Sequence, residues 1–153
     1  MKQHENILVF SQKSACFVRD SKNAMVYNPQ ITTGCKPYVC KRNSHTSTNY
    51  DYKNFKITST VNKGERYPTD ILFYRHDKEK IHPTQKPVAL IQYLIRTYSN
   101  EGDTILDNCM GSGTTAIAAI REKRNFIGFE LNKEYYDKAC KRIEIEQAQL
   151  TLF

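Results

Sequence analysis

The chain has 153 residues, of which 39% are apolar, and a net charge of +7. That length supports one domain with a real hydrophobic core and is too short for two ordinary ones. No apolar run approaches the length of a membrane span, and the polar residues 1–5 do not resemble a signal peptide, so we expect a cytoplasmic protein without a membrane partner. The five cysteines follow no regular framework, which favours reduced thiols over disulfides.

The positive charge is confined to the first half of the chain. Residues 1–80 hold 14 Lys and Arg against 7 Asp and Glu, whereas residues 81–153 hold nine of each kind. Such an asymmetry favours a surface that faces a polyanion, with nucleic acid as the leading candidate. On charge alone, a generic solubilising surface is an equally good explanation.

Short strands are predicted at residues 4–10 and 71–74, where apolar residues form brief buried-type runs. Between them, residues 11–66 interleave tyrosines with cations, a mixture that suits phosphate contacts and stacking on bases. Residues 56–61 are strand-like and are expected to pair as a hairpin. A small β-rich flap with no nucleic-acid role is the alternative for this region. The predicted DNA-facing residues are Lys36, Lys41, Arg42, Lys53 and Lys56.

Cys35, Cys40 and His45 lie close together in the sequence and could form part of a zinc site. Their spacing is loose and no fourth ligand is evident, so we predict no metal.

The second half alternates helices and strands. A helix is predicted over residues 88–98 from apolar positions at helical spacing, followed by a strand at 104–107. A small-residue helix over 114–121 and a strand at 125–129 follow. A last helix over 133–148 is capped by Asn132, and its predicted inner face consists of Tyr136, Ala139, Cys140 and Ile143. This order predicts an α/β fold with a parallel, doubly wound sheet.

A glycine-containing turn between the predicted strand at 104–107 and the predicted helix over 114–121 indicates a ligand site. Gly111 and Gly113 allow a sharp turn and close backbone approach, and the helix that follows offers free N–H groups. Glu130 ends the next strand, where a carboxylate can accept bonds from ribose hydroxyls. Asp107 can face a positively charged group of the ligand. A glycine turn of this kind also fits a nicotinamide-dependent oxidoreductase, which would leave residues 82–87 unexplained.

Residues 67–143 resemble the β-class S-adenosylmethionine-dependent DNA methyltransferases of bacteria and phages, which modify adenine N6 or cytosine N4. The resemblance rests on His82-Pro83-Thr84-Gln85-Lys86-Pro87 and on the run from Asp107 to Thr115. It implies a partial Rossmann-like methyltransferase sheet with a β-rich or irregular basic insertion, DNA methylation in a restriction–modification setting, and double-stranded DNA as partner. Phe129 or Leu131 would flank the adenine ring. The implied cofactor-binding residues are Thr84, Gln85, Lys86, Asp107, Asn108, Met110, Gly111, Ser112, Gly113, Thr114 and Glu130.

The family's catalytic signature, an Asp, Asn or Ser followed by two prolines and an aromatic residue, is absent from these residues. The five prolines are never adjacent, so no catalytic residue is assigned. We therefore expect the C-terminal part of a methyltransferase, from a truncated gene or a split enzyme, whose complementary fragment or second subunit carries the motif. Adenine N6 is favoured over cytosine N4. The alternative is a non-catalytic DNA- or cofactor-binding module, such as a regulatory subunit or a decayed remnant.

Residues 1–153 are expected to form a single partial methyltransferase domain. Within it we assign residues 1–10 to a late core strand, 11–66 to DNA recognition and 67–148 to cofactor binding. The tail Gln149–Phe153 resembles the peptide by which bacterial replication and repair proteins bind the sliding clamp, and an apolar tail folded onto its own helix is the alternative.

Overall fold

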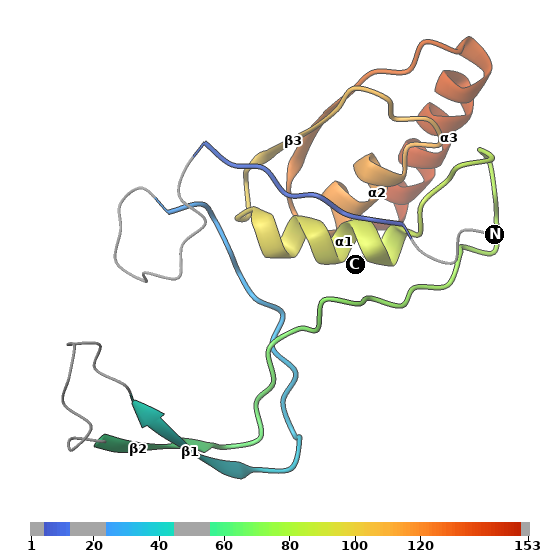
Figure 1. Ribbon diagram of the computed structural model, residues 1–153. Helices are drawn as coiled ribbons and strands as arrows, with labels where there is room; N and C mark the ends of the chain where they lie inside the picture. The colour runs from blue at the N-terminus through green and yellow to red at the C-terminus, as the bar shows by residue number, and fades with distance from the viewer. Residues whose placement is uncertain (1–4, 13–23, 45–55, 151–153) are drawn as a thin grey trace. The chain divides into compact units, whose positions relative to one another are not determined.

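This computed structural model describes residues 5–12, 24–44 and 56–150 (Figure 1). The chain divides into two compact units, one formed by residues 1–28 and 73–153 and the other by residues 29–72. The predicted DNA-facing Lys53 and the end of the tail at 151–153 lie outside the described residues, as does His45.

The smaller unit is a hairpin arm. Strand β1 (Tyr38–Ser44) pairs antiparallel with β2 (Lys56–Asn62), from Tyr38 opposite Asn62 to Ser44 opposite Lys56. The predicted hairpin is thus confirmed. An isolated antiparallel β-bridge between Thr32 and Arg66 adds one pairing outside these two strands. The turn after β2 requires glycine at Gly64. Its φ is +102°, and a Cβ there would lie 2.3 Å from the carbonyl oxygen of Cys35.

The larger unit contains a parallel strand pair with a helical crossover. Strands β3 (Thr104–Asp107) and β4 (Asn125–Gly128) are joined by α2 (Thr114–Arg121) and pair in register, with Thr104 opposite Asn125. The predicted strand–helix–strand order is confirmed, and β4 ends one residue earlier than predicted.

Two longer helices complete this unit. Helix α1 (Val88–Tyr98) has the predicted bounds and packs on α2. Helix α3 (Lys133–Leu150) begins where predicted, because the Asn132 side chain accepts the N–H groups of Glu134 at 2.9 Å and Tyr135 at 3.2 Å. None of the helices in the described part of the chain is long and apolar enough to cross a bilayer.

The core lies between the helices and one face of the β3–β4 pair. Its buried residues are Val88, Ile95, Ile117, Ala118 and Ala119, with Ile105 and Phe126 of the strands packed against them. The alanines of the predicted small-residue helix, α2, are fully buried in this core. On the opposite face, Leu106 and Ile127 are 66% and 51% exposed, so the described residues cover one sheet face and not the two of a doubly wound sheet.

Two predicted strands are wrong. Residues 5–10 and 71–74 are extended but form no ladder within the described residues, and Phe10 and Phe73 are 87% and 91% exposed. Apolar character alone does not make a strand, because a strand also needs a neighbouring backbone to pair with. In the larger unit, β3 and β4 pair only with each other among the described residues.

Candidate functional site

The glycine turn connects the end of β3 to the start of α2. Gly111 and Gly113 have φ of +54° and +76°, the left-handed region that glycine tolerates. Gly113 is the N-cap of α2 and offers no capping side chain, so the first turn of the helix presents its N–H groups and positive dipole end. The turn is tied to β4, since the Met110 N–H donates to the Phe129 carbonyl at 2.9 Å.

The two predicted carboxylates flank this turn. Glu130 accepts the Gly111 N–H at 2.8 Å through Oε2 and the Asn132 N–H at 2.8 Å through Oε1. Asp107 accepts the Cys109 N–H at 3.0 Å through Oδ1 and the Thr115 hydroxyl at 2.6 Å through Oδ2. Each of these four oxygens retains a lone pair, so both groups can accept further bonds from a ligand.

The environment of Glu130 favours its ionised form. The backbone N–H groups of Asn132 and Gly111 and the nearby His82 hold the pKa of the Glu130 carboxyl below its ordinary value. The carboxylate is thus a fixed negative charge at neutral pH, with its orientation set by two backbone donors.

The element His82–Pro87 lies directly against the glycine turn. A Cβ added to Gly111 would meet the His82 ring at 3.6 Å, and that ring packs edge-on against Tyr135 of α3 at a centroid distance of 4.4 Å. The Thr84 hydroxyl lies 3.0 Å from His82 Nδ1. The motif histidine thus links the 82–87 element to both the turn and α3.

The three predicted residues of this element have different environments. Thr84 and Lys86 are exposed, and the Lys86 ammonium pairs with Glu5 at 2.6 Å. Gln85 is buried, with its amide donating to Asp77 at 3.2 Å and to the Glu79 carbonyl at 3.0 Å, and accepting the Ile81 N–H at 3.0 Å. Its contacts hold the loop before α1 and do not reach the glycine turn.

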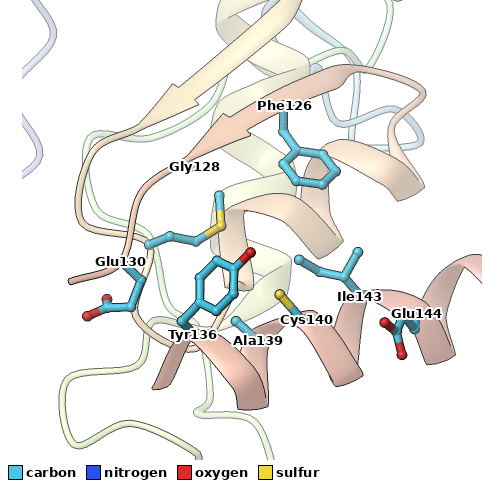
Figure 2. Close-up of a pocket in the computed structure, with 9 residues that line it drawn as sticks. Phe126, Gly128, Glu130, Tyr136, Ala139, Cys140, Ile143 and Glu144 are labelled. Atoms are coloured by element: carbon cyan, nitrogen blue, oxygen red, sulfur yellow. The ribbon is translucent and has the colours of Figure 1, made fainter. Parts of the chain in front are cut away.

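The predicted turn residues also have different environments. Asn108 is exposed, whereas Ser112 and Thr114 are buried, with their hydroxyls 3.1 Å apart. Met110 helps to line an open cavity of about 290 Å³ whose other lining residues come mostly from β4 and α3 (Figure 2). It lies over Gly128, where a Cβ would be only 1.8 Å from the methionine methyl carbon. The cavity is lined by Met110, Phe126, Gly128, Glu130, Tyr136, Ala139, Cys140, Ile143 and Glu144.

Four of these cavity residues form the inward face of α3 that the sequence predicted: Tyr136, Ala139, Cys140 and Ile143. Tyr136 nevertheless remains 50% exposed, because it lies at the open side of the cavity. The residues predicted to flank an adenine ring are both on the surface, with Phe129 59% exposed and Leu131 fully exposed.

The predicted DNA-facing residues belong to the hairpin arm. Lys36 and Lys41 are exposed, and Arg42 and Lys56 lie on paired strands. Sequence reasoning missed Arg66, whose guanidinium lies 4.6 Å from the centre of the Tyr38 ring and donates to the Lys36 carbonyl at 2.6 Å. Within the described residues no group of three His, Cys, Asp or Glu side chains is arranged to hold a metal.

Asp77 and Arg142 were also missed, although they connect the two motifs. The Arg142 guanidinium reaches the Ser112 carbonyl, and Asp77 reaches both Gln85 and the start of α1. The sequence did contain a signal for Arg142, because it is a cation among the apolar residues on the inner face of α3.

A parallel strand pair with a glycine turn, a helical crossover and a carboxylate after the second strand defines a Rossmann-like α/β unit of the nucleoside-binding type. The chain belongs to the DNA methylase family, whose model (N6_N4_Mtase) matches residues 1–141.

Individual relatives match a shorter part of the chain. The DNA adenine methyltransferase YhdJ of Escherichia coli (strain K12) is 44% identical over 72 residues, which are 47% of this chain and 24% of that protein. The type II methyltransferase M2.DpnII of Streptococcus pneumoniae is 40% identical over 99 residues, 62% of this chain and 37% of that protein. In M.HpaI of Haemophilus parainfluenzae, 44% identity extends over 62% of this chain and 30% of that protein.

The matches therefore span between a quarter and somewhat over a third of these relatives' lengths. Among solved structures, the M1.HpyAVI–SAM complex is 47% identical, with a TM-score of 0.45 over 48% of this chain and 36% of that chain. The cytosine-N4-specific PvuII DNA methyltransferase is 28% identical, with a TM-score of 0.47 over 49% of this chain and 31% of that chain.

Proposed function

We propose that this chain provides the S-adenosylmethionine-binding part of a site-specific DNA methyltransferase, which methylates a base amine in a restriction–modification setting. The observation that carries the proposal is the bond from the Gly111 N–H to Glu130, beside the His82 ring. It brings the two sequence motifs and the ribose-type carboxylate into one site, in a chain of the DNA methylase family. We propose adenine N6 rather than cytosine N4 as the methylated atom, and the relative named as a DNA adenine methyltransferase supports this choice.

The residues present fit the cofactor. Two glycines with positive φ let the backbone approach a ligand, and the uncapped start of α2 offers N–H donors. Glu130 is ionised and retains acceptor capacity for two ribose hydroxyls. Asp107 places a second carboxylate where the positively charged methionine end would lie.

When bound, S-adenosylmethionine supplies an electrophilic methyl group on its sulfonium. Glu130 and Asp107 would orient the ribose and the methionine end, and the exposed Thr84 and Lys86 of the 82–87 element would close over the latter. Catalysis further needs an acceptor for the amine hydrogen, because the lone pair of the base amine is delocalised into the ring, and an aromatic surface for the flipped base. In this proposal an Asp-Pro-Pro-Tyr-type segment outside residues 1–153 supplies both, since no two prolines here are adjacent.

The hairpin arm is proposed to contact the DNA. Its exposed Lys36 and Lys41 and its strand residues Arg42 and Lys56 provide cations for phosphates, and Tyr38, 49% exposed, provides a flat ring next to Arg66. Replacing Lys36 and Lys41 by Gln should weaken DNA binding and reduce its salt slope by about 0.9 per lost phosphate contact. Lys138→Gln on α3 is the control.

Methyl transfer from labelled S-adenosylmethionine to unmethylated DNA tests the proposal, with the chain alone and mixed with a polypeptide that carries an Asp-Pro-Pro-Tyr segment. Transfer by the mixture, lost in Glu130→Gln, supports it. If no transfer occurs but the cofactor and DNA bind, the chain is a non-catalytic binding module. Robust transfer by the chain alone would contradict the assignment of the catalytic segment to another polypeptide.

A further inference from the structure

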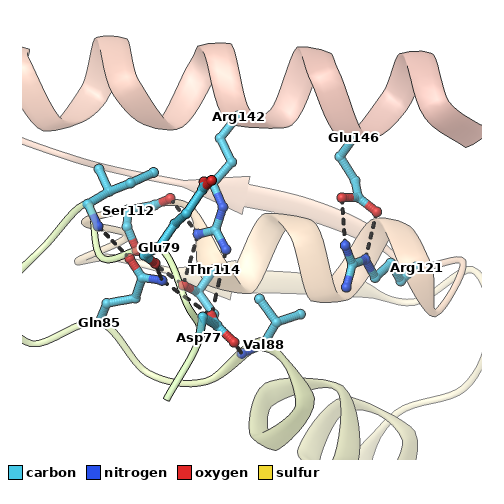
Figure 3. Close-up of polar contacts among 10 residues, drawn as sticks. Asp77, Glu79, Gln85, Val88, Ser112, Thr114, Arg121, Arg142 and Glu146 are labelled. Carbon is cyan, nitrogen blue, oxygen red and sulfur yellow. Dashed lines mark hydrogen bonds and ion pairs between the residues drawn. The ribbon is translucent and has the colours of Figure 1, made fainter. Parts of the chain in front are cut away.

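One arginine of α3 contacts the glycine turn. Arg142 donates from one guanidinium nitrogen to the Ser112 carbonyl at 3.1 Å and to the Thr114 hydroxyl at 3.3 Å (Figure 3). Ser112 carries its carbonyl at the centre of the turn, between the two glycines with positive φ. Arg142 thus fixes a peptide group that has few conformational restraints of its own.

The other guanidinium nitrogen of Arg142 lies 3.8 Å from Asp77, which organises the 82–87 element. The Asp77 carboxylate accepts the Val88 N–H at 3.3 Å through either oxygen. It thereby caps α1, whose N-cap residue Pro87 has no side-chain oxygen. It also accepts the Gln85 amide at 3.2 Å, and Gln85 in turn holds the loop from Glu79 to Ile81.

This pair of charges therefore joins the two motifs in addition to the contact between His82 and Gly111. Only 22% of the Arg142 side chain and 27% of the Asp77 side chain are exposed, so solvent screens the pair less than a surface ion pair. Burial lowers the pKa of Arg142, and the Asp77 carboxylate opposes that shift. Neither side chain contacts Glu130 or Asp107 in the interactions described above, so both act through the backbone that they hold.

We propose that Arg142 and Asp77 are positioning residues, which hold the glycine turn and the 82–87 element in the relative placement that cofactor binding requires. The proposal rests on the proposed function of this site. It predicts that removing Arg142 weakens binding of S-adenosylmethionine without removing any group that touches the cofactor.

The chain offers a control ion pair that also involves α3. Arg121 of α2 binds Glu146 of α3 with two hydrogen bonds, at 2.6 and 2.8 Å, as Figure 3 also shows. This ion pair has better geometry than the Arg142–Asp77 pair, and its side chains contact neither motif. Arg121→Gln therefore tests what loss of an ion pair to α3 does when no hydrogen bond to either motif is removed.

The experiment measures the dissociation constant of S-adenosylmethionine by calorimetry for the 153-residue chain and its variants, each first shown to melt cooperatively. Arg142→Met should weaken binding about tenfold, the equivalent of one lost hydrogen bond to a charged group. Arg142→Lys should recover part of this loss, because it keeps the charge and one donor. Asp77→Asn should be milder than Asp77→Ala, because the amide oxygen can still cap α1. Arg121→Gln should lower the melting temperature and leave binding within about twofold.

Peptide-level deuterium exchange on the cofactor-free chain is a second readout. Arg142→Met should raise exchange in residues 107–116, where the Gly111 and Gly113 amides are bonded, whereas Arg121→Gln should not. Unchanged binding and exchange in Arg142→Met, or an equal loss of binding in Arg121→Gln, would overturn the inference. If the unmodified chain binds no cofactor, the proposed function fails, and the exchange comparison still decides whether Arg142 holds the turn.

Discussion

Gly113 gives the sharpest stability prediction, because two separate penalties meet at this residue. Its φ of +76° is unfavourable for any residue with a Cβ, at about 1–2 kcal/mol. An added Cβ would also lie 3.2 Å from the Cβ of Ala139, and both atoms are fixed directly to backbone, so α3 would have to move. Overpacking of this kind costs about 1–3 kcal/mol. We therefore expect Gly113→Ala to lower the free energy of unfolding by roughly 2–5 kcal/mol.

Gly102 is the matched control for the backbone penalty. Its φ is +84°, and an added Cβ there would meet nothing within 4 Å. Gly102→Ala should therefore lose only the conformational part, about 1–2 kcal/mol. Urea unfolding of both variants measures the difference.

A double-mutant cycle isolates the contact itself. Ala139→Gly alone should destabilise by about 1 kcal/mol through its helix propensity. Combined with Gly113→Ala, it removes the close contact, so the double variant should be more stable than additivity predicts by about 1 kcal/mol. Equal losses in Gly113→Ala and Gly102→Ala, together with strict additivity in the cycle, would refute the packing argument.

Three further predictions concern the ends of the strands and the tail. The pKa of Glu130 is lowered on folding from an ordinary value of 4.5, so its stabilising contribution is present above that pH and is lost as the pH falls through the folded value. In acid titrations monitored by thermal melting, Glu130→Gln should therefore show a smaller loss of stability than the unmodified chain. Gly128→Ala should lower the melting temperature because its Cβ meets Met110, and Met110→Ala in the same chain should restore part of the loss. A bacterial sliding clamp used as bait should capture the full chain and should not capture a chain that lacks residues 149–153. Equal capture of both would contradict the predicted clamp-binding peptide.

Much of the larger unit was predictable because its signals are local. The bounds of α1 and α2 follow from apolar spacing and from the glycines around them, and Asn132 fixes the start of α3 through two short-range bonds. The glycine turn and Glu130 were predictable for the same reason, since the carboxyl ends of adjacent parallel strands meet at one edge of a sheet.

The failures depend on long-range partners. Residues 5–10 and 71–74 have strand-like composition, but no sequence pattern states which backbone they pair with. Nor does a motif state the direction of each side chain. Gln85 points into the loop before α1, and Met110 points into the cavity beside β4. The role of Arg142 depends on a carbonyl 30 positions earlier in the chain, a distance at which helix periodicity carries no information.

Direct binding of S-adenosylmethionine is the simplest test of a cofactor site within residues 67–148. Equilibrium dialysis with labelled cofactor, on a chain that melts cooperatively, should give saturable binding at one site. S-adenosylhomocysteine should displace the label, NAD should not, and Glu130→Gln should weaken binding. A cooperatively folded chain that shows no saturable binding, or that binds NAD equally well, would contradict the account.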